Sequence, residues 1–390
     1  MNTRINVLFF MDGIGNAGGI QEMALKWIEN FNPQKVRVDI LSYDTGKKDN
    51  YPERVKKFGC EVYIVPTYTR RTTFFKSLHD TEMFFKENKG KYDVIHAHAS
   101  AKAFFVLWYA KKYGINVRIL HSHSSRTISE KVVQRLAANC LKIPASLLTT
   151  DKFACSPEAG KYLFGRFAVK TGRVKIIHNA IDIEKFKYDK EERDEIREKL
   201  NISNKFVVGH VGRFMEPKNH DFLIDVFEKI YKKEKNAVLV CVGSGGLEET
   251  IKKKCIDLRI DDRVMFLGFR SDVNKIMQAF DLLIMPSLFE GLPVTGVEAQ
   301  ALGVPALFAD TITKDAAILP QSSYLSLKQS PEEWADKALE YKTMQKEENP
   351  SKYIVQKGYD LKLETKKLEE YYFMSLSLIH ISEPTRPLYI

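Results

Sequence analysis

Glu290 and Glu298 form a pair of carboxylates that could act together on one ligand. Seven residues separate them, and both lie in the stretch 281–305, DLLIMPSLFEGLPVTGVEAQALGVP. An ionised carboxylate only accepts hydrogen bonds, so two of them near one site suit hydroxyl groups better than phosphate oxygens. The pair therefore predicts a hydroxyl-bearing ligand.

The elements around the two carboxylates add a phosphate site. The apolar run 281–286 predicts a buried parallel strand, and Gly291 and Pro293 predict a loop after it. A helix is expected over 295–302, with Gly303 after its end. A helix that follows such a strand offers free backbone N–H groups and a positive dipole end, which favour phosphate. Phosphate donors beside hydroxyl acceptors indicate a nucleotide sugar.

Two cations, Arg213 and Lys218, lie in another predicted strand-to-helix loop, within GHVGRFMEPKNH. Arg can engage two oxygens of a diphosphate at once, and Lys acts as a point charge. The alternative is a chance placement of two cations on the surface. The pair predicts that the diphosphate of the ligand binds this loop.

Four histidines lie at the ends of two predicted strands, His96 and His98 at one, His121 and His123 at the other. Alternating histidines at a strand end can ligate a metal, but no nearby carboxylate or Cys completes the set. The alternative is a buried, hydrogen-bonded core histidine. We expect no metal site here.

The stretch with the two glutamates, with FEGLP before and EAQALGVP after, resembles the Glu-x7-Glu signature of retaining glycosyltransferases with the GT-B fold. It looks most like glycosyltransferase family 4, in its bacterial exopolysaccharide and capsule branch. The likeness covers about residues 4–372. It implies transfer of a sugar, with retention, from a nucleotide diphosphate sugar such as a UDP-sugar to a hydroxyl acceptor such as a lipid-linked glycan. The sequence has no Asp-x-Asp motif of the metal-dependent type, so neither metal nor cofactor is expected.

The resemblance also implies roles for individual residues. Glu290 would be catalytic at the sugar hydroxyls, and His121 would lie beside the reacting carbon of the donor sugar. Arg213 and Lys218 match the family's phosphate-binding pair and would stabilise the leaving diphosphate. The implied substrate-binding positions are Gly18, Gly19, Asn179, Gly212, Gly268, Phe269, Gly291, Leu292, Pro293, Val294 and Glu298.

The resemblance is more specific for some of these positions. The backbone of 268–270 would meet the nucleotide base. Asn179 opens NAIDIEKF, where Ala180 replaces the usual glycine of the family and so weakens the backbone argument at that point. Glu298 lies two helical turns, or ~12 Å, beyond Glu290, which suits the ribose hydroxyls.

No carboxylate is evident as a nucleophile, so the resemblance implies front-face transfer, in which the leaving phosphate assists the acceptor.

Two other classes of protein are also compatible with the sequence. A nucleotide-sugar 2-epimerase shares the two-domain shape and would turn over the donor without an acceptor. A non-catalytic nucleotide-sugar-binding subunit would bind the donor without turnover.

Strands and helices alternate in both halves of the chain. This pattern predicts an α/β protein with two doubly wound, Rossmann-like domains facing a cleft, as in the GT-B fold. We expect an N-terminal acceptor-side domain over 1–175, a highly charged linker region over 176–204 and a nucleotide-sugar-binding domain over 205–350. The resemblance implies that a last helix, 351–373, crosses back to the first domain.

The composition, with 44% hydrophobic and 28% charged residues among 390, predicts a globular protein. No apolar run reaches the ~18–20 residues of a membrane span. The five scattered cysteines include no CxxC pair, which fits a reducing cytosol better than a disulfide framework or a zinc finger. We therefore expect a cytoplasmic protein.

The net charge of +10 arises in the N-terminal part, because residues 1–170 have 27 Lys and Arg against 15 Asp and Glu. Such a surplus can face nucleic acid, an anionic membrane or an anionic substrate. Motifs of RNA-binding proteins are absent, so no nucleic acid partner is expected. A basic amphipathic helix within 126–147, with Lys131, Arg135 and Lys142, predicts peripheral contact with the inner face of the cell membrane. The alternative is a solvated helix face.

The stretch 376–386, LSLIHISEPTR, looks like the translation of a transposase adapter used in sequencing libraries. The alternative is a genuine tail. We expect the natural sequence to end near Phe373 or Met374, and residues 375–390 to be disordered and dispensable.

Overall fold

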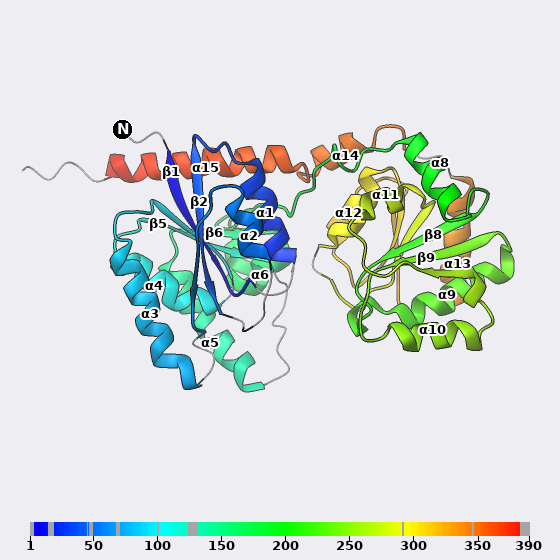
Figure 1. Ribbon diagram of the computed structural model, residues 1–390, viewed down its shortest axis with the longest axis horizontal. Coiled ribbons are helices and arrows are strands. Elements are labelled where there is room, and N and C mark those ends of the chain that lie inside the picture. The colour runs from blue at the N-terminus through cyan, green and yellow to red at the C-terminus, as the bar shows by residue number, and fades with distance from the viewer. Residues whose placement is uncertain are drawn as a thin grey trace, which may run out of the picture. The chain divides into compact units, whose positions relative to one another are not determined.

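A computed structural model describes residues 4–14, 19–44, 46, 50–67, 71–99, 101–123, 132–290, 292–344 and 347–382. For residues 71, 101, 132–139 and 378–382 it describes the backbone alone. The chain divides into two compact units. The first comprises Met1–Asn179 and Leu361–Ile390, and the second Ala180–Asp360. Each unit is a parallel sheet with helices packed on it (Figure 1).

The first unit contains a seven-stranded sheet with the order β3-β2-β1-β4-β5-β6-β7. Its strands are β1 (Ile5–Met11), β2 (Val36–Tyr43), β3 (Val62–Val65), β4 (Val94–His98), β5 (Val117–Ser122), β6 (Asp151–Ala154) and β7 (Lys175–Ile176). Its α-helices are α1 (Gly19–Asn30), α2 (Tyr51–Lys56), α3 (Phe74–Glu87), α4 (Phe104–Lys112), α5 (Val132–Leu148), α6 (Pro157–Phe164), α7 (Arg166–Lys170) and α15 (Leu361–Ser382).

Side chains of β1 alternate between the two faces of this sheet, as the period of a strand requires. Leu8 and Phe10 join the core formed with α3, α4 and α5. Phe9 points to the other face, where its ring meets those of Phe31 and His96 at 6.4 and 5.5 Å between centroids. Helices α1 and α15 pack together on that second face.

The second unit contains a six-stranded sheet with the order β10-β9-β8-β11-β12-β13. Its strands are β8 (Phe206–Val211), β9 (Ala237–Val242), β10 (Val264–Phe266), β11 (Leu282–Met285), β12 (Ala306–Ala309) and β13 (Ser323–Leu325). Its α-helices are α8 (Lys190–Lys199), α9 (His220–Lys233), α10 (Glu248–Asp257), α11 (Val273–Gln278), α12 (Val294–Ala301), α13 (Pro331–Glu340) and α14 (Pro350–Gln356).

Both sheets reverse their strand order once, between β1 and β4 in the first unit and between β8 and β11 in the second. Ligands of doubly wound sheets bind outside the carboxyl ends of the strands at such a reversal. The two reversals therefore define where each unit can bind a ligand. The predicted α/β architecture with two Rossmann-like domains is confirmed.

The core of the second unit covers both faces of its sheet. Leu239 joins the cluster with α9 and α13, and its neighbour Val240 joins the cluster with α11 and α12. On β8, a Cβ atom at Gly209 would lie 2.1 Å from Cδ2 of Phe280. Glycine at this position lets the aromatic ring pack directly on the strand.

The expected linker over 176–204 is corrected by the structure, because the charged helix α8 packs within the second unit against α11. Asp189 caps this helix through a hydrogen bond from the Glu192 N–H at 3.1 Å. Arg193 and Arg197 contact the carboxylate of Asp281 at 2.5 and 3.2 Å. The charges on which the linker prediction was based include two partly buried arginines that share one carboxylate.

The expected disorder after Met374 is wrong for residues 375–382, because α15 extends to Ser382. Ser375 is only 9% exposed. Neither Gly nor Pro occurs from Leu361 to Ser382, so nothing in this segment breaks a helix. Residues 383–390 lie outside the described part of the chain. Neither α15 nor any other helix in the described ranges has the length and apolar character needed to cross a membrane.

Candidate active site

The second unit places three of the predicted catalytic residues at its strand reversal. Arg213 and Lys218 follow β8, and Glu290 lies between β11 and α12. Because β8 pairs directly with β11, the loops that follow these two strands are neighbours. Residues far apart in the sequence thus meet at one edge of one sheet.

Lys218 and Glu290 form a close ion pair between Nζ and Oε1. The hydroxyl of Ser287 donates to the same carboxylate oxygen over 2.9 Å. The two charged side chains are 23% and 12% exposed, so solvent screens their interaction only in part. The structure therefore brings together the cation predicted for the diphosphate and the carboxylate predicted for the sugar hydroxyls.

The loops that carry this pair are tied to each other by backbone contacts. Asn219 adopts left-handed dihedrals, φ 56° and ψ 45°, and its side-chain amide donates to the carbonyl of Pro286 at 3.0 Å. The N–H of Leu288 donates to the carbonyl of Pro217 at 2.9 Å. Sequence reasoning missed Asn219 and Ser287. Asn directly after Lys218 was the available signal, because Asn is enriched in the left-handed region.

Two buried imidazoles lie behind the Lys218 loop. Burial lowers the pKa of His210 to about 4, although its Nδ1–H donates to the carbonyl of Ile284 at 2.8 Å. Burial also lowers the pKa of His220 to about 2, and the charges of His210 and Lys218 act in the same direction. Both rings are neutral at neutral pH, so the positive charge of this loop comes from Arg213 and Lys218.

Three glycine-containing loops meet beside the same strand ends. The Gly212 N–H donates to the carbonyl of Val242 at 2.9 Å, and the Gly243 N–H donates to that of Gly268 at 2.8 Å. Gly243 has a φ of 138°, and a Cβ there would lie 2.1 Å from the oxygen of Gly212. Phe269 is 84% exposed. No role was predicted for Gly243, although the glycine-rich run GSGG directly after β9 was an available signal.

Helix α12 begins at Val294, and its N-cap residue, Pro293, makes no side-chain cap hydrogen bond. Pro293 before it is buried, and Leu292 is partly buried. Glu298 lies inside this helix and is partly exposed. Gly291 lies outside the described residues. The helix thus starts one residue before the predicted start at Thr295.

Arg213 differs from Lys218 in its surroundings. Its side chain is exposed, and among the described residues its guanidinium has no hydrogen-bond or ion-pair partner. A cation of this kind, in the same loop as a paired cation, has the chemistry to bind a diphosphate.

The first unit brings all four predicted histidines together at its own strand reversal. His96 and His98 lie in β4, and His121 and His123 lie at the end of the adjacent β5. The rings of His96 and His121 stack with 5.3 Å between centroids and 10° between planes. The indole of Trp27 stacks on His121 at 5.6 Å. We call these four residues the histidine cluster.

The histidine cluster is uncharged at neutral pH. Burial, followed by the neighbouring imidazoles, lowers the pKa values of His96, His98 and His121 well below the usual 6.5. Burial lowers the pKa of His123 to about 4, although the nearby Asn179 acts in the opposite direction. These residues can therefore serve as neutral donors or acceptors of hydrogen bonds.

Three members, His96, His98 and His121, have possible metal-ligating atoms within 4.8 Å of one another. Both nitrogens of His96 are already engaged, Nδ1 with the hydroxyl of Tyr372 at 2.7 Å and Nε2 with Nδ1 of His121 at 3.2 Å. Metal binding through His96 would break one of these contacts. The cluster therefore favours hydrogen bonding over chelation.

A cavity of about 120 Å³ opens beside the cluster. It is lined by Asp12, Ile20, His98, Ala99, His121, Ser122, His123 and Tyr162. Asp12 contacts Lys102 at 2.7 Å. Burial raises the pKa of Asp12, and the charge of Lys102 opposes this shift. His121, the predicted catalytic histidine, thus borders a space that can hold part of a ligand.

The other residues predicted for this unit lie near the same edge. Asn179 interacts with His123 of the cluster. Gly19 begins α1, and a Cβ there would meet no atom within 4 Å, so packing within the unit does not require glycine at this position. Gly18 lies outside the described residues.

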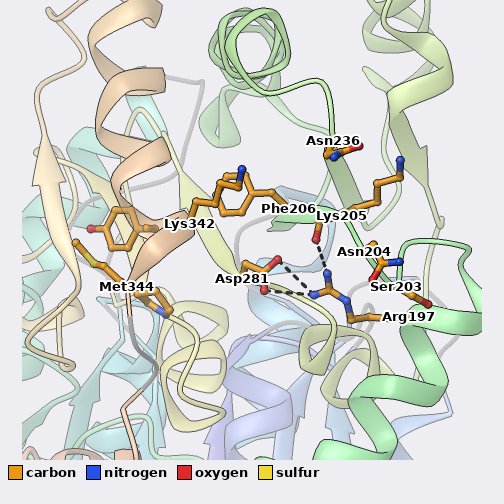
Figure 2. Close-up of a pocket in the computed structure, with 11 residues that line it drawn as sticks. Arg197, Ser203, Asn204, Lys205, Phe206, Asn236, Asp281, Lys342 and Met344 are labelled. Carbon is orange, nitrogen blue, oxygen red and sulfur yellow. Dashed lines mark hydrogen bonds and ion pairs between the residues drawn. The ribbon is translucent and has the colours of Figure 1, made fainter.

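A second cavity, of about 420 Å³, lies at the amino-terminal edge of the sheet of the second unit (Figure 2). Figure 2 shows Arg197 between the carboxylate of Asp281 and the carbonyl of Lys205, which both accept hydrogen bonds from it. None of the predicted site residues lines this cavity. It therefore lies at the opposite edge of the sheet from Lys218 and Glu290.

Known proteins resemble the chain in both units. The family described as Glycosyltransferase Family 4 matches residues 17–185, and the family described as Glycosyl transferases group 1 matches residues 192–359. EpsF of Bacillus subtilis (strain 168), named as a glycosyltransferase, is 31% identical over 335 residues, which cover 85% of this chain and 86% of that protein.

Two further similarities concern named activities and solved structures. The UDP-Gal:alpha-D-GlcNAc-diphosphoundecaprenol alpha-1,3-galactosyltransferase of Escherichia coli is 26% identical over 299 residues, covering 75% of this chain and 76% of that protein. The structure of Anabaena HepE in complex with UDP-glucose aligns with a TM-score of 0.70 at 16% identity, over 97% of this chain and 100% of that chain.

Proposed function

Because the chain belongs to the glycosyltransferase families described as Glycosyl transferases group 1 and Glycosyltransferase Family 4, we propose that it moves a sugar from a UDP-sugar to a lipid-linked glycan with retention of configuration. The protein is a glycosyltransferase with the GT-B fold, and a similar protein of Staphylococcus aureus is named for capsular polysaccharide biosynthesis. The observation that carries the proposal is the contact of Lys218, Ser287 and Glu290 at the strand reversal of the second unit.

The donor is proposed to bind the second unit through both parts of its chemistry. Arg213 and Lys218 provide positive charge for the diphosphate, while the neutral His210 and His220 add none. Glu290, held by Lys218 and Ser287, accepts hydrogen bonds from the hydroxyls of the sugar. HepE, which aligns over nearly the whole chain, was solved with UDP-glucose, and this supports a UDP-sugar here.

Negative charge grows on the diphosphate as the bond to the sugar breaks. Fixed cations near that charge stabilise the transition state more than the ground state. Lys218 suits this task because Glu290 fixes its position before the reaction. Because Glu290 is ion-paired with Lys218, we assign it to sugar binding and not to nucleophilic attack, and the transfer proceeds on the front face. No metal is required in this scheme.

The acceptor is proposed to be presented at an anionic membrane on the cytoplasmic side. On α5 of the first unit, Ile143 and Leu147 are 70% and 77% exposed and lie one helical turn apart. Lys142 beside them lies over the ring of Tyr162 at 3.5 Å. Lys131 and the side chain of Arg135 lie outside the description. The similar Escherichia coli enzyme is named for a diphosphoundecaprenol-linked acceptor, which supports a lipid-linked acceptor here.

A donor and acceptor assay tests the proposal. Purified protein is incubated with UDP-glucose, UDP-galactose or UDP-N-acetylglucosamine, with and without an undecaprenyl diphosphate-linked sugar, in the presence of EDTA. We expect UDP release and a lengthened lipid-linked product that depend on the acceptor. Conversion of the donor to its 2-epimer without acceptor would identify an epimerase, and binding of every donor without turnover would identify a non-catalytic subunit.

A further inference from the structure

A chain of buried hydrogen bonds links α15 to the histidine cluster. The hydroxyl of Tyr372 lies 2.7 Å from Nδ1 of His96, and Nε2 of His96 lies 3.2 Å from Nδ1 of His121. All three side chains are fully buried. The positions of hydrogens follow from the donors and acceptors that each group has available.

Tyr372 sets the direction of this chain. Within the described residues, the nitrogen of His96 is the one hydrogen-bond partner of its hydroxyl. If His96 donated from Nδ1, the O–H of Tyr372 would be buried without an acceptor, which is costly. The hydroxyl therefore donates, and Nδ1 of His96 accepts.

The hydrogens of the two imidazoles follow from that direction. A neutral imidazole carries one N–H, so His96 with an accepting Nδ1 must carry its hydrogen on Nε2. That hydrogen is donated to Nδ1 of His121, which in turn must carry its own hydrogen on Nε2. Burial keeps both rings neutral by lowering their pKa values well below 6.5.

We propose that Tyr372 and His96 are positioning residues that fix the tautomer of His121, so that His121 offers an Nε2–H donor to the cavity it lines. Nε2 of His121 makes no close hydrogen bond to a described residue, although the backbone carbonyl of Ile177 acts on this ring as a hydrogen-bond acceptor would. An Nε2–H can turn from that weak contact to an oxygen of a bound sugar, and it cannot remove a proton. The catalytic consequence rests on the proposed function, whereas the tautomer does not.

The second pair of the histidine cluster offers an internal contrast. Nδ1 of His98 and Nε2 of His123 lie 3.1 Å apart. Nε2 of His98 and Nδ1 of His123 make no close hydrogen bond to a described residue. Asn179 acts on His123, but a side-chain amide offers both a donor and an acceptor and so does not impose a direction. The hydroxyl of Tyr372 thus fixes the tautomer of His121, whereas His98 can take either tautomer.

Nuclear magnetic resonance of the ring nitrogens tests the tautomer in the intact protein. Protein labelled with nitrogen-15 in its histidine rings is measured near neutral pH, and signals are assigned with His96→Gln and His121→Gln. We expect a protonated Nε2 and an unprotonated Nδ1 for both His96 and His121. A protonated Nδ1 on His121 would overturn the proposal, whether or not the protein transfers sugar.

Tyr372→Phe tests the role of the hydroxyl, with Tyr371→Phe as a matched control. Tyr371 is the neighbouring residue of α15, and its hydroxyl donates to Asp151 and not to a histidine. We expect Tyr372→Phe to give a mixture of His121 tautomers and to lower kcat about tenfold with little change in KM, while Tyr371→Phe does neither. A kcat loss in Tyr372→Phe with an unchanged His121 tautomer would mean a merely structural role. If Tyr372→Phe fails to fold, the tautomer of His121 in the unmodified protein still decides whether the proposal holds.

Discussion

The two units present different chemistry at the same place in the same topology. Both sheets reverse their order beside the first strand of the unit. The first unit presents neutral imidazoles there. The second presents an ion pair and Arg213, a cation without a partner in the described part of the chain. The strand reversal thus determines where a ligand can bind, while the residues near it determine which part of the ligand is bound.

The position of each residue along its element explains the contrast. His96, His98 and His121 lie within strands of a sheet covered on both faces, so burial keeps them neutral. Lys218 and Glu290 lie in loops beyond their strands, where side chains stay partly solvated and can remain charged. A site for hydroxyls and a site for a diphosphate can therefore arise from one fold.

The largest expected effect is on stability at low pH. The pKa of a histidine is near 6.5 in the unfolded chain, and the pKa values of His123 and His210 are about 4 in the folded protein. Below pH 6.5 the unfolded chain binds more protons, so the free energy of unfolding falls as the pH drops from 6.5 towards 4. Each fully shifted histidine contributes roughly 3 kcal/mol to this loss.

Thermal unfolding at about pH 7 and about pH 5 checks this expectation. The variant His123→Asn should lose less stability between these two pH values than the unmodified protein, because one buried titrating group is gone. His79→Gln is the control, since His79 is exposed. An equal loss in His123→Asn and the unmodified protein would contradict a neutral, buried His123.

Binding of UDP should depend on both cations of the second unit. Removing one charged hydrogen bond typically costs ~1.5–3 kcal/mol, so Arg213→Ala and Lys218→Ala should each weaken UDP binding in calorimetry. Lys218→Ala should have the larger effect because it also leaves Glu290 without its cation. Lys232→Ala, on the exposed side of α9, serves as the control. Unchanged affinity in both site variants would place the diphosphate elsewhere.

A smaller effect is expected on membrane binding by the surface of the first unit. Ile143→Ser with Leu147→Ser, or Lys142→Glu, should reduce co-sedimentation with anionic vesicles, and added salt should do the same. A basic residue near such a surface contributes ~1 kcal/mol. Ile256→Ser, at an exposed apolar residue of the second unit, is the matched control. Vesicle binding that changes neither in these variants nor with added salt would favour an acceptor in solution.

The sequence was informative where the signal is local. The strand predicted over 281–286 and the helix over 295–302 correspond to β11 (Leu282–Met285) and α12 (Val294–Ala301). Apolar runs and loop residues mark such elements within a few residues of chain. The resemblance to glycosyltransferase family 4 is confirmed by the family matches.

The sequence did not predict contacts between residues that are far apart along the chain. Asp281 forms ion pairs with Arg193 and Arg197 from more than 80 residues away in the sequence. Composition alone therefore predicted a linker where the structure has α8. Tyr372 lies 276 residues from His96, and Ser287 binds Glu290 in a way that no spacing rule requires. Contacts of this kind depend on which strands pair, and the order of strands in a sheet cannot be predicted from any single segment of the sequence.

The central claim is that the second unit binds the donor with separable roles for its two glutamates. Glu290→Gln and Glu298→Gln are compared by calorimetry with UDP and by turnover of the donor with acceptor. We expect Glu290→Gln to lower kcat on the order of 10²-fold with nearly unchanged affinity for UDP. Glu298→Gln should weaken UDP binding by ~1–3 kcal/mol. The reverse pattern would exchange the two roles, and the absence of any effect in both variants would contradict the account.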